Sequence, residues 1–321
     1  MRRLVAFVPL RVFVPLAAFV LLTMSMFGGA RAEDGLLSGT LKTVSDRGTI
    51  LIGYRESAPP FSFVNRAGQP IGFSMDLCHG IAEDVARTLN RDLVEADAPA
   101  WQTGVRVVYV PVKAEERLPK IVAGAIDLEC GSTTANAERA KSVAFSPIFF
   151  LAGTKLLVPL VDGRPAIPSY RALAGRTIVA GAGTTNIIAV RRLASTVSPA
   201  ITVAEVPNLD AAYDMLAAGK ADAFASDDIL LSGFVATRPD GKRFGITGDY
   251  LSYEPYAIGF RRDDPGFADL VRDSFGRMAN EGALNRLYAK WLVDRLPSGE
   301  TLNVPMSPQL AEMYRVLGQP D

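Results

Sequence analysis

The chain has 321 residues, of which 34 are basic, 34 are acidic and 49% are hydrophobic. The first 32 positions hold four arginines (Arg2, Arg3, Arg11 and Arg31) and no acid, so the remainder has 30 basic against 34 acidic residues, a formal charge of −4. Because nucleic-acid phosphates need a basic face, this balance argues against a nucleic-acid partner.

Residues 1–32 are predicted to be a signal peptide. A basic start precedes an apolar run from Val12 to Phe27, and Ala30-Arg31-Ala32 has the small-x-small pattern that a signal peptidase cleaves. A membrane anchor is the alternative, but the uninterrupted apolar run is short for a bilayer span. We therefore expect cleavage near Ala32 and a periplasmic location. The 289 residues that remain are enough for two lobes with their own cores.

The first half of the mature chain predicts alternating strands and helices. A buried strand at Gly48–Gly53 runs into a proline-rich extended loop at Ala58–Phe63. Ser74 is expected to cap a helix whose apolar residues repeat at helical spacing up to Leu89. Further along we expect a strand at Arg106–Val110, a helix at Glu115–Ala123 closed by Gly124, and a strand at Ile126–Glu129.

The second half repeats this order. It predicts a strand at Gly175–Gly181, a helix from Ile187, a helix at Leu209–Ala218 closed by Gly219, and a strand at Ala223–Ala225. The run Ala-Gly-x-x-Asp ends at Asp127 in one half and at Asp222 in the other, where each aspartate is expected to be structural. The pattern indicates two α/β lobes with parallel strands, and in such sheets ligands bind beyond the carboxyl ends of the strands.

The end of the chain predicts an extended segment and then helices. Glu254–Arg262 is extended, a helix starts at Asp264-Pro265, a shorter one covers Ala283–Leu292, and Ser307 caps a last one. Because these helices have no strands of their own, we expect them to pack on the first lobe. The predicted boundaries are 33–151 and 258–299 for lobe 1, 152–257 for lobe 2, and 300–321 for a tail on lobe 1.

Cys78 and Cys130 leave two alternatives open, a disulfide or two buried thiols. No third ligand is evident that would make either cysteine a metal site, and the sequence indicates no cofactor. The single histidine, His79, lies in a predicted helix with no evident partner. The segment Glu95–Gly104 has no predicted role.

The segment Cys130–Arg139 is the strongest candidate for an anion site. It follows a predicted strand and offers Ser132, Thr134 and Arg139. Hydroxyls, free backbone N–H groups and a planar guanidinium together suit a carboxylate. The alternative is an ordinary turn with a solvated arginine.

A set of motifs in chain order resembles the polar amino-acid-binding proteins of bacterial ABC importers (solute-binding protein family 3), closest to the glutamate/aspartate-binding branch. The motifs lie at Gly53–Phe63, Gly72–Leu77, Arg117–Pro119, Glu129–Arg139, Gly183–Thr185, Asp227–Leu231, Tyr253–Tyr256, Arg262–Asp264 and Lys290–Trp291. The resemblance implies an α/β fold of two doubly wound lobes, the type II periplasmic-binding-protein fold. It also implies hinge strands near Phe150–Thr154 and Glu254–Phe260, and hinge closure around an amino acid.

The resemblance also implies the site residues. Arg139, Ser132 and Thr134 would hold the α-carboxylate, with Thr185 adding donors at a helix N-terminus. Asp227 would accept from the α-ammonium group, while Asp228 is expected to cap the following helix. Arg55 and Arg117 would meet a side-chain carboxylate. Two departures from the branch, Ala114 and Leu209, stand where it has a hydroxyl and a histidine, so amino-acid binding is better supported than selectivity for dicarboxylates.

The expected function is therefore a monomeric binding protein that delivers glutamate, aspartate or their amides to an ABC permease. An exported dehydratase of the cyclohexadienyl type on the same fold is the alternative. An enzyme would need a general acid or base facing the ligand, and the sequence contains one histidine and no evident nucleophile–base pair. A receptor's sensor lobe is a third alternative, but no signalling or transmembrane segment follows in this chain.

Overall fold

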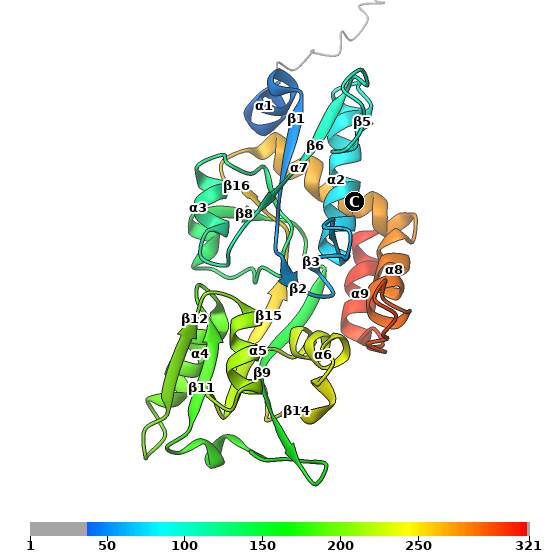
Figure 1. Ribbon diagram of the computed structural model, residues 1–321. Helices are drawn as coiled ribbons and strands as arrows, with labels where there is room; N and C mark the ends of the chain where they lie inside the picture. Colours follow the sequence, from blue (N-terminus) through cyan, green and yellow to red (C-terminus); the bar gives the residue numbers. More distant parts are fainter. Residues whose placement is uncertain (1–36, 320–321) are drawn as a thin grey trace, which may run out of the picture. The chain divides into compact units, whose positions relative to one another are not determined.

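The computed structural model describes residues 37–319, and from Ser38 onward the chain forms one unit containing two large β-sheets, each with its own helices, and a small third sheet (Figure 1). The predicted signal peptide lies outside the described residues. Within the described range, every helix is too short or too polar to cross a bilayer.

The sheet of lobe 1 has six strands in the order β5-β6-β1-β7-β16-β8, and its first four strands run parallel. Helices α1 and α2 pack on its central strand β1, in which Ile50 and Ile52 are fully buried. The strands are β1 (Thr49–Tyr54), β5 (Leu93–Val94), β6 (Val105–Pro111), β7 (Leu128–Glu129), β8 (Val143–Phe145) and β16 (Gly259–Arg261). The helices of this lobe that come before β9 in the chain are α1 (Gly39–Arg47), α2 (Phe73–Thr88) and α3 (Arg117–Val122).

The sheet of lobe 2 has the order β10-β9-β13-β11-β12, with β14 and β15 also paired to β9. Strands β12, β11 and β13 run parallel, and β9 is antiparallel to β13. The strands are β9 (Phe150–Val161), β10 (Arg164–Pro165), β11 (Thr177–Gly181), β12 (Thr202–Val206), β13 (Ala223–Asp227), β14 (Phe244–Thr247) and β15 (Tyr253–Tyr256). The helices are α4 (Thr185–Ala194), α5 (Leu209–Ala217) and α6 (Asp228–Thr237).

Two strands connect the sheets. The start of β9 pairs with β15, with Phe150 opposite Tyr256 and Gly153 opposite Tyr253, before β9 continues along β13 and β14 (Figure 1). These are the segments that were predicted as hinges. The predicted fold of two α/β lobes joined by two strands is therefore confirmed.

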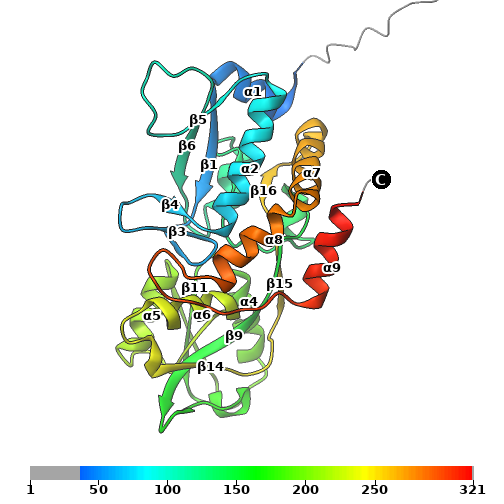
Figure 2. The same ribbon diagram turned by 90° about the vertical axis from the view of Figure 1, so that its right-hand side faces the viewer.

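The C-terminal helices pack against α2 and against one another. They are α7 (Pro265–Asn280), α8 (Ala283–Tyr288), a π-helical turn at Ala289–Val293, and α9 (Pro308–Leu317). Asp264 and Ser307 cap α7 and α9 through their side chains, as the sequence predicts. Figure 2 shows α9 beside α7 and α8, and the Tyr314 hydroxyl donates to the carbonyl of Phe149 at 2.6 Å. The predicted boundaries between the two lobes remain a prediction.

Several local predictions were wrong. Ser74 does not cap α2, which begins at Phe73 after Gly72; the Ser74 hydroxyl donates instead to the Gly131 carbonyl at 2.7 Å. The proline-rich segment Ala58–Phe63 is not a free loop but contributes to a small sheet of β2 (Ser57–Ala58), β3 (Ser62–Val64) and β4 (Pro70–Ile71). Strand β7 is shorter than predicted because the side chain of Asp127 turns back to accept from the N–H of Leu51 at 2.8 Å.

The two cysteines form a disulfide, which decides between the two alternatives that the sequence left open. Cys78 of α2 is bonded to Cys130, directly after β7, across 52 residues of chain. The bond ties the helix that covers β1 to the start of the turn that carries Ser132 and Thr134.

Candidate functional site

All seven predicted site residues line one small cavity between the two lobes, with a volume of about 20 Å³. From lobe 1 come Arg55, Arg117, Ser132, Thr134 and Arg139, and from lobe 2 come Thr185 and Asp227. The remaining lining residues are Thr184, Asn186, Leu209, Ser226 and Leu230, which the sequence reasoning did not select.

The topology explains why these residues meet. Arg55 directly follows β1, Ser132 lies in the turn after β7, and Asp227 is the last residue of β13. Thr185 is the first residue of α4, after the carboxyl end of β11. Because the central strands of each sheet are parallel, these polar turns gather at one edge of each sheet, and the two edges face one another.

Arg55 is a buried arginine that lines the cavity. Its side chain makes no hydrogen bond to any residue within 37–319, although the residue is only 5% exposed. Burial, and then the charge of Arg117, lower the pKa of Arg55 to about 10, which leaves it protonated at neutral pH. Its donors are therefore available to a negatively charged group in the cavity.

Arg117 and Arg139 are held by carbonyl and hydroxyl oxygens. Arg117 donates to the carbonyl of Ala114 at 2.8 Å and to the hydroxyl of Thr133 at 2.6 Å. Arg139 donates to the carbonyl of Thr134 at 2.9 Å. Arg117 and Arg139 also donate to the carbonyl of Gly183 in lobe 2, at 3.3 Å and 3.5 Å. Burial lowers the pKa of Arg139 to about 10. The two arginines thus join lobe 1 to the turn before α4.

Asp227 is the acid on the opposite side of the cavity. One carboxylate oxygen accepts from the Asn186 amide at 2.7 Å, and the other accepts from the Tyr256 hydroxyl. Burial, and then the negative charge of Glu254, raise the pKa of Asp227 to about 7. This carboxylate would gain a favourable counter-charge if a cation entered the cavity.

Glu254 is a buried acid that the sequence reasoning did not single out, although it lies within the recognised Tyr253–Tyr256 motif. Its Oε2 accepts from the hydroxyls of Thr134 and Thr185, each at 2.6 Å. The sequence feature that could have indicated Glu254 is an acidic residue within an otherwise uncharged hinge strand. Thr134 and Thr185 therefore direct their protons to a protein carboxylate in this structure, which the resemblance did not foresee.

Glu129 is a second buried acid outside the predicted set. It is fully buried at the end of β7, and within residues 37–319 neither oxygen has a hydrogen-bond partner. Its charge raises the pKa values of Arg55 and Arg139, partly offsetting the effect of burial. Together with Asp227 and Glu254 it balances the three arginines of the cavity.

Other predictions on acids and on His79 had mixed outcomes. Asp127 and Asp222 are structural as expected, each accepting from the backbone N–H at the start of the neighbouring strand at 2.8 Å. Asp228 is the first residue of α6 and not the one before it, but its carboxylate does accept from a first-turn N–H, that of Ile229, at 2.9 Å, and also from the N–H of Gly153 and the hydroxyl of Tyr250. His79 does have a partner, because its ring lies 2.8 Å from a Glu95 oxygen.

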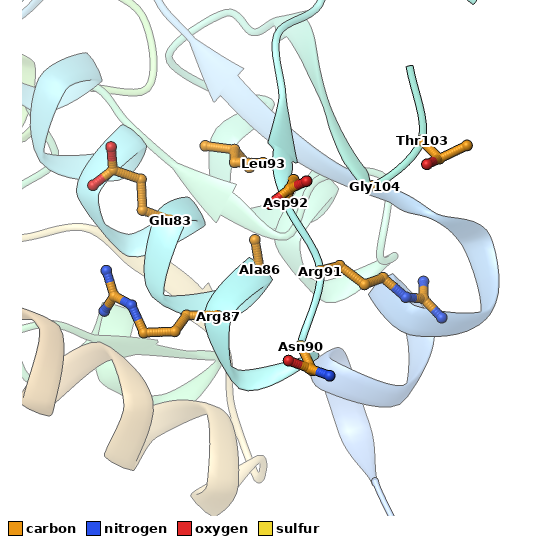
Figure 3. A pocket seen from close by; sticks show the side chains of 9 residues that line it. All are labelled: Glu83, Ala86, Arg87, Asn90, Arg91, Asp92, Leu93, Thr103 and Gly104. Carbon is orange, nitrogen blue, oxygen red and sulfur yellow. The ribbon is translucent and has the colours of Figure 1, made fainter. Parts of the chain in front are cut away.

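A larger hollow of about 930 Å³ lies where α2 ends and β5 begins (Figure 3). Its charged side chains, among them Glu83, Arg87 and Arg91, point in different directions and do not converge on a common point. None of the predicted site residues lines it. Within residues 37–319, no group of three or more metal-binding side chains comes together.

Comparison with known proteins gives a consistent result. Residues 50–294 match the family described as bacterial extracellular solute-binding proteins, family 3. The chain is 29% identical to the glutamate/aspartate import solute-binding protein of Salmonella typhimurium, over 92% of this chain and 94% of the relative. It is 33% identical to the L-glutamate/L-aspartate-binding protein of Pseudomonas aeruginosa, over 86% and 88%.

Solved structures show the same similarity. An ancestral arginine-binding protein bound to glutamine superposes with a TM-score of 0.65 and 27% identity, covering 77% of this chain and 99% of the other. An ancestral amino-acid-binding protein, described as a precursor of cyclohexadienyl dehydratase, superposes with a TM-score of 0.64 and 25% identity over 79% and 99%.

Proposed function

Because the chain belongs to the bacterial extracellular solute-binding proteins of family 3, we propose that it captures a polar amino acid in the periplasm and delivers it to an ABC permease. Glutamate and aspartate, or their amides, are the favoured ligands, as the names of two similar relatives suggest. Residues 1–32 would be removed as a signal peptide, with cleavage near Ala32.

One observation carries the proposal: arginines, hydroxyls and a carboxylate from both lobes line the same cavity. An amino acid is a zwitterion, so its site needs an anion clamp and a cation acceptor at a fixed separation. Arg139 and Ser132 form the clamp on lobe 1, and Asp227 is the acceptor on lobe 2. Charge-assisted hydrogen bonds contribute about 1.5–3 kcal/mol each, and several of them reach the ~8 kcal/mol of a micromolar site after ordering costs.

Arg55 is the best candidate to bind the side chain of the ligand. Its guanidinium group has no hydrogen bond to residues 37–319, whereas Arg117 already donates to Ala114, Thr133 and Gly183. The sequence resemblance assigned both arginines to this role. We therefore assign the larger share of any selectivity for a side-chain carboxylate to Arg55.

The ligand would enter an open form of the cleft. A cavity of about 20 Å³ holds little more than one water molecule, and the hydroxyls of Thr134 and Thr185 approach to 3.4 Å across it. Bending of β9 and β15 would separate the lobes, and an amino acid that contacts both lobes would favour the closed form.

A second candidate function is a dehydratase acting on a small acid. The similarity to a precursor of cyclohexadienyl dehydratase favours it, as does the raised pKa of Asp227, because a carboxyl group with a pKa of about 7 can act as an acid or a base. Against it, Asp227 already accepts from Asn186 and Tyr256, which suits the binding of an ammonium group.

Isothermal calorimetry with the twenty standard amino acids, together with a turnover assay on a prephenate-like acid, separates the two functions. We expect binding of glutamate, aspartate or their amides and no turnover. Turnover of the acid without binding of any amino acid would overturn the proposal.

Side-chain selectivity is tested by Arg55→Met, which removes the charge but keeps much of the volume. We expect the preference for glutamate over glutamine to fall at least tenfold, because only glutamate has a side-chain carboxylate to pair with Arg55. Arg139→Met is the matched control and should weaken both ligands by a similar factor. Equal losses for both ligands in the Arg55 variant would show that the assignment is wrong.

A further inference from the structure

Glu254 joins the two halves of the proposed site without lining the cavity. It lies in β15, is 1% exposed, and is absent from the residues that form the cavity wall. Its Oε2 is 2.6 Å from the hydroxyl of Thr134 on one lobe and 2.6 Å from that of Thr185 on the other. Its Oε1 accepts from the hydroxyls of Ser252 and Thr154. Glu254 can therefore act on a ligand through the hydrogen bonds of the two threonines, and through its charge on Asp227.

Each threonine hydroxyl has a single proton, and the group that accepts this proton determines whether the hydroxyl can still donate to a ligand. An ionised carboxylate only accepts hydrogen bonds, whereas a threonine hydroxyl has one proton to donate and two lone pairs. With both protons directed at Glu254, Thr134 and Thr185 have only lone pairs left for a group in the cavity. They then act as acceptors there, not as donors to a carboxylate.

Asp227 is a third acceptor in the same cavity, on lobe 2. Its two oxygens already accept from Asn186 and Tyr256, and a carboxylate has further lone pairs for the cavity. Thr134, Thr185 and Asp227 all line the cavity. A ligand group that satisfies three acceptors must bring several donors, and an ammonium group has three.

We propose that Glu254 is a positioning residue that fixes Thr134 and Thr185 as hydrogen-bond acceptors, so that the site requires an ammonium group and rejects an acid of the same shape without one. This inference rests on the proposed function. A buried acceptor that faces a ligand without a donor keeps an unpaired lone pair, which disfavours the desamino acid strongly.

The test compares L-glutamate with glutarate, and L-glutamine with glutaramate, which are matched ligands with and without the amino group. By calorimetry we expect the unmodified protein to bind the better amino acid at least ~100-fold more tightly than its desamino partner. In Glu254→Met, which removes the acceptor but keeps the length, the hydroxyl protons become free to donate. The ratio should then fall at least tenfold, mainly through weaker binding of the amino acid.

Glu254→Gln separates positioning from charge. Its amide oxygen can accept both hydroxyl protons, so we expect most of the wild-type ratio to return. If Glu254→Gln behaves as Glu254→Met does, the effect is one of charge and the proposal fails. It also fails if Glu254→Met keeps the full ratio, or if it weakens both members of a pair equally, as a purely structural defect would.

Threonine variants give an independent test should Glu254→Met not fold. Thr134→Val and Thr185→Val should each weaken the amino acid more than the desamino acid, and the corresponding serine variants should restore the ratio. A larger loss for the desamino acid would mean that the hydroxyls donate to a carboxylate, which overturns the proposal. Failure of the proposed function would look different, because the unmodified protein would then bind no amino acid at all.

Discussion

Asp227 combines burial with a role that needs its charge. It is 4% exposed, and Glu254 adds a second negative charge nearby, so its carboxylate is disfavoured until a cation arrives. Tyr256 and Asn186 stabilise the ionised form through their hydrogen bonds, which lower its pKa but do not cancel the effect of burial. The ionised carboxylate of Asp227 therefore destabilises the ligand-free protein, but it is the form that can bind an ammonium group.

Asp227→Asn is expected to raise the free energy of unfolding of the ligand-free protein more at pH 8 than at pH 5. The folded-state pKa of Asp227 is raised from 3.8 to about 7, so folding favours the protonated carboxyl group and wild-type stability falls as the pH rises through this window. The uncharged variant escapes that loss, which is on the order of 2–4 kcal/mol. Urea denaturation at both pH values measures it.

The same residue makes a prediction for binding. Because the proposed ammonium contact needs the ionised carboxylate, the affinity of the wild-type protein should increase as the pH rises from 6 to 8. Calorimetry across that range measures the change. An affinity independent of pH, or equal unfolding differences for Asp227→Asn at pH 5 and pH 8, would argue against the raised pKa.

At the scale of elements, the turn before α4 in lobe 2 brings the backbone of Gly183 close to the backbone of Glu115 in lobe 1. Gly183 has a φ of +67°, and a Cβ at this position would lie 2.7 Å from the backbone N and Cα of Glu115 in lobe 1. Glycine meets two requirements here: a left-handed backbone conformation and a close approach that no side chain allows.

Gly183→Ala should therefore weaken ligand binding at least tenfold, because the closed form contains the collision and an open form does not. Gly175→Ala is the matched control: Gly175 has a φ of +70° and no atom within 4 Å of the added Cβ. Both variants should lose similar thermal stability from backbone strain, measured by calorimetric melting. Equal affinities of the two variants would show that the approach of Gly183 to Glu115 does not matter for closure.

The disulfide links two elements that support the site. Cys78 and Cys130 are both fully buried, and the bond closes 52 residues between α2 and the end of β7. Replacing both cysteines by alanine should lower the free energy of unfolding by about 2–4 kcal/mol, mainly because the unfolded chain regains freedom. Urea denaturation measures it, with the wild-type protein under reducing conditions as a comparison. A variant as stable as the oxidised protein would contradict the expectation.

The segment Glu95–Gly104, for which the sequence suggested no role, is organised around one arginine. Arg106 at the start of β6 donates to the carbonyls of Glu95, Ala98 and Pro99 at 2.9–3.2 Å. His79 contacts Glu95 from α2. These contacts hold the loop on lobe 1, away from the residues that line the cavity.

At the scale of the whole molecule, the two sheets meet through polar contacts that are also the proposed ligand contacts. Arg117 and Arg139 reach Gly183, and Glu254 binds a threonine from each lobe. Apolar contacts accompany them: Gly233 of α6 packs closely against Pro59, and one hydrophobic cluster contains residues of both lobes, among them Leu128 and Leu230. Because opening breaks only the contacts between the lobes and not the core of each lobe, it is expected to cost less free energy than unfolding.

Small-angle X-ray scattering should show a larger radius of gyration for the ligand-free protein than for the protein saturated with its amino acid. The physical reason is that a ligand binding both lobes favours the closed form. An Arg139→Ala variant, which should not bind, is the control and should show no change on addition of ligand. An identical radius for the wild-type protein in both conditions would contradict hinge closure.

By itself the sequence determined the alternation of strands and helices, the polar turns that follow the strands, and the family. These features depend on residues close together in the chain: apolar periodicity, helix caps at Asp264 and Ser307, and short motifs such as Glu129–Arg139. The seven predicted site residues lie at the carboxyl ends of strands or in the segments that follow them, and parallel strands bring these segments to one end of a sheet.

Only the tertiary structure decided which partner each polar group has. Thr134 and Glu254 are 120 residues apart, and no local pattern shows that one donates to the other. The choice between a disulfide and two thiols, the burial of Arg55 and the raised pKa of Asp227 are of the same kind. Hydrogen bonding and burial depend on the distances between side chains in space, which only the packing of the two lobes establishes.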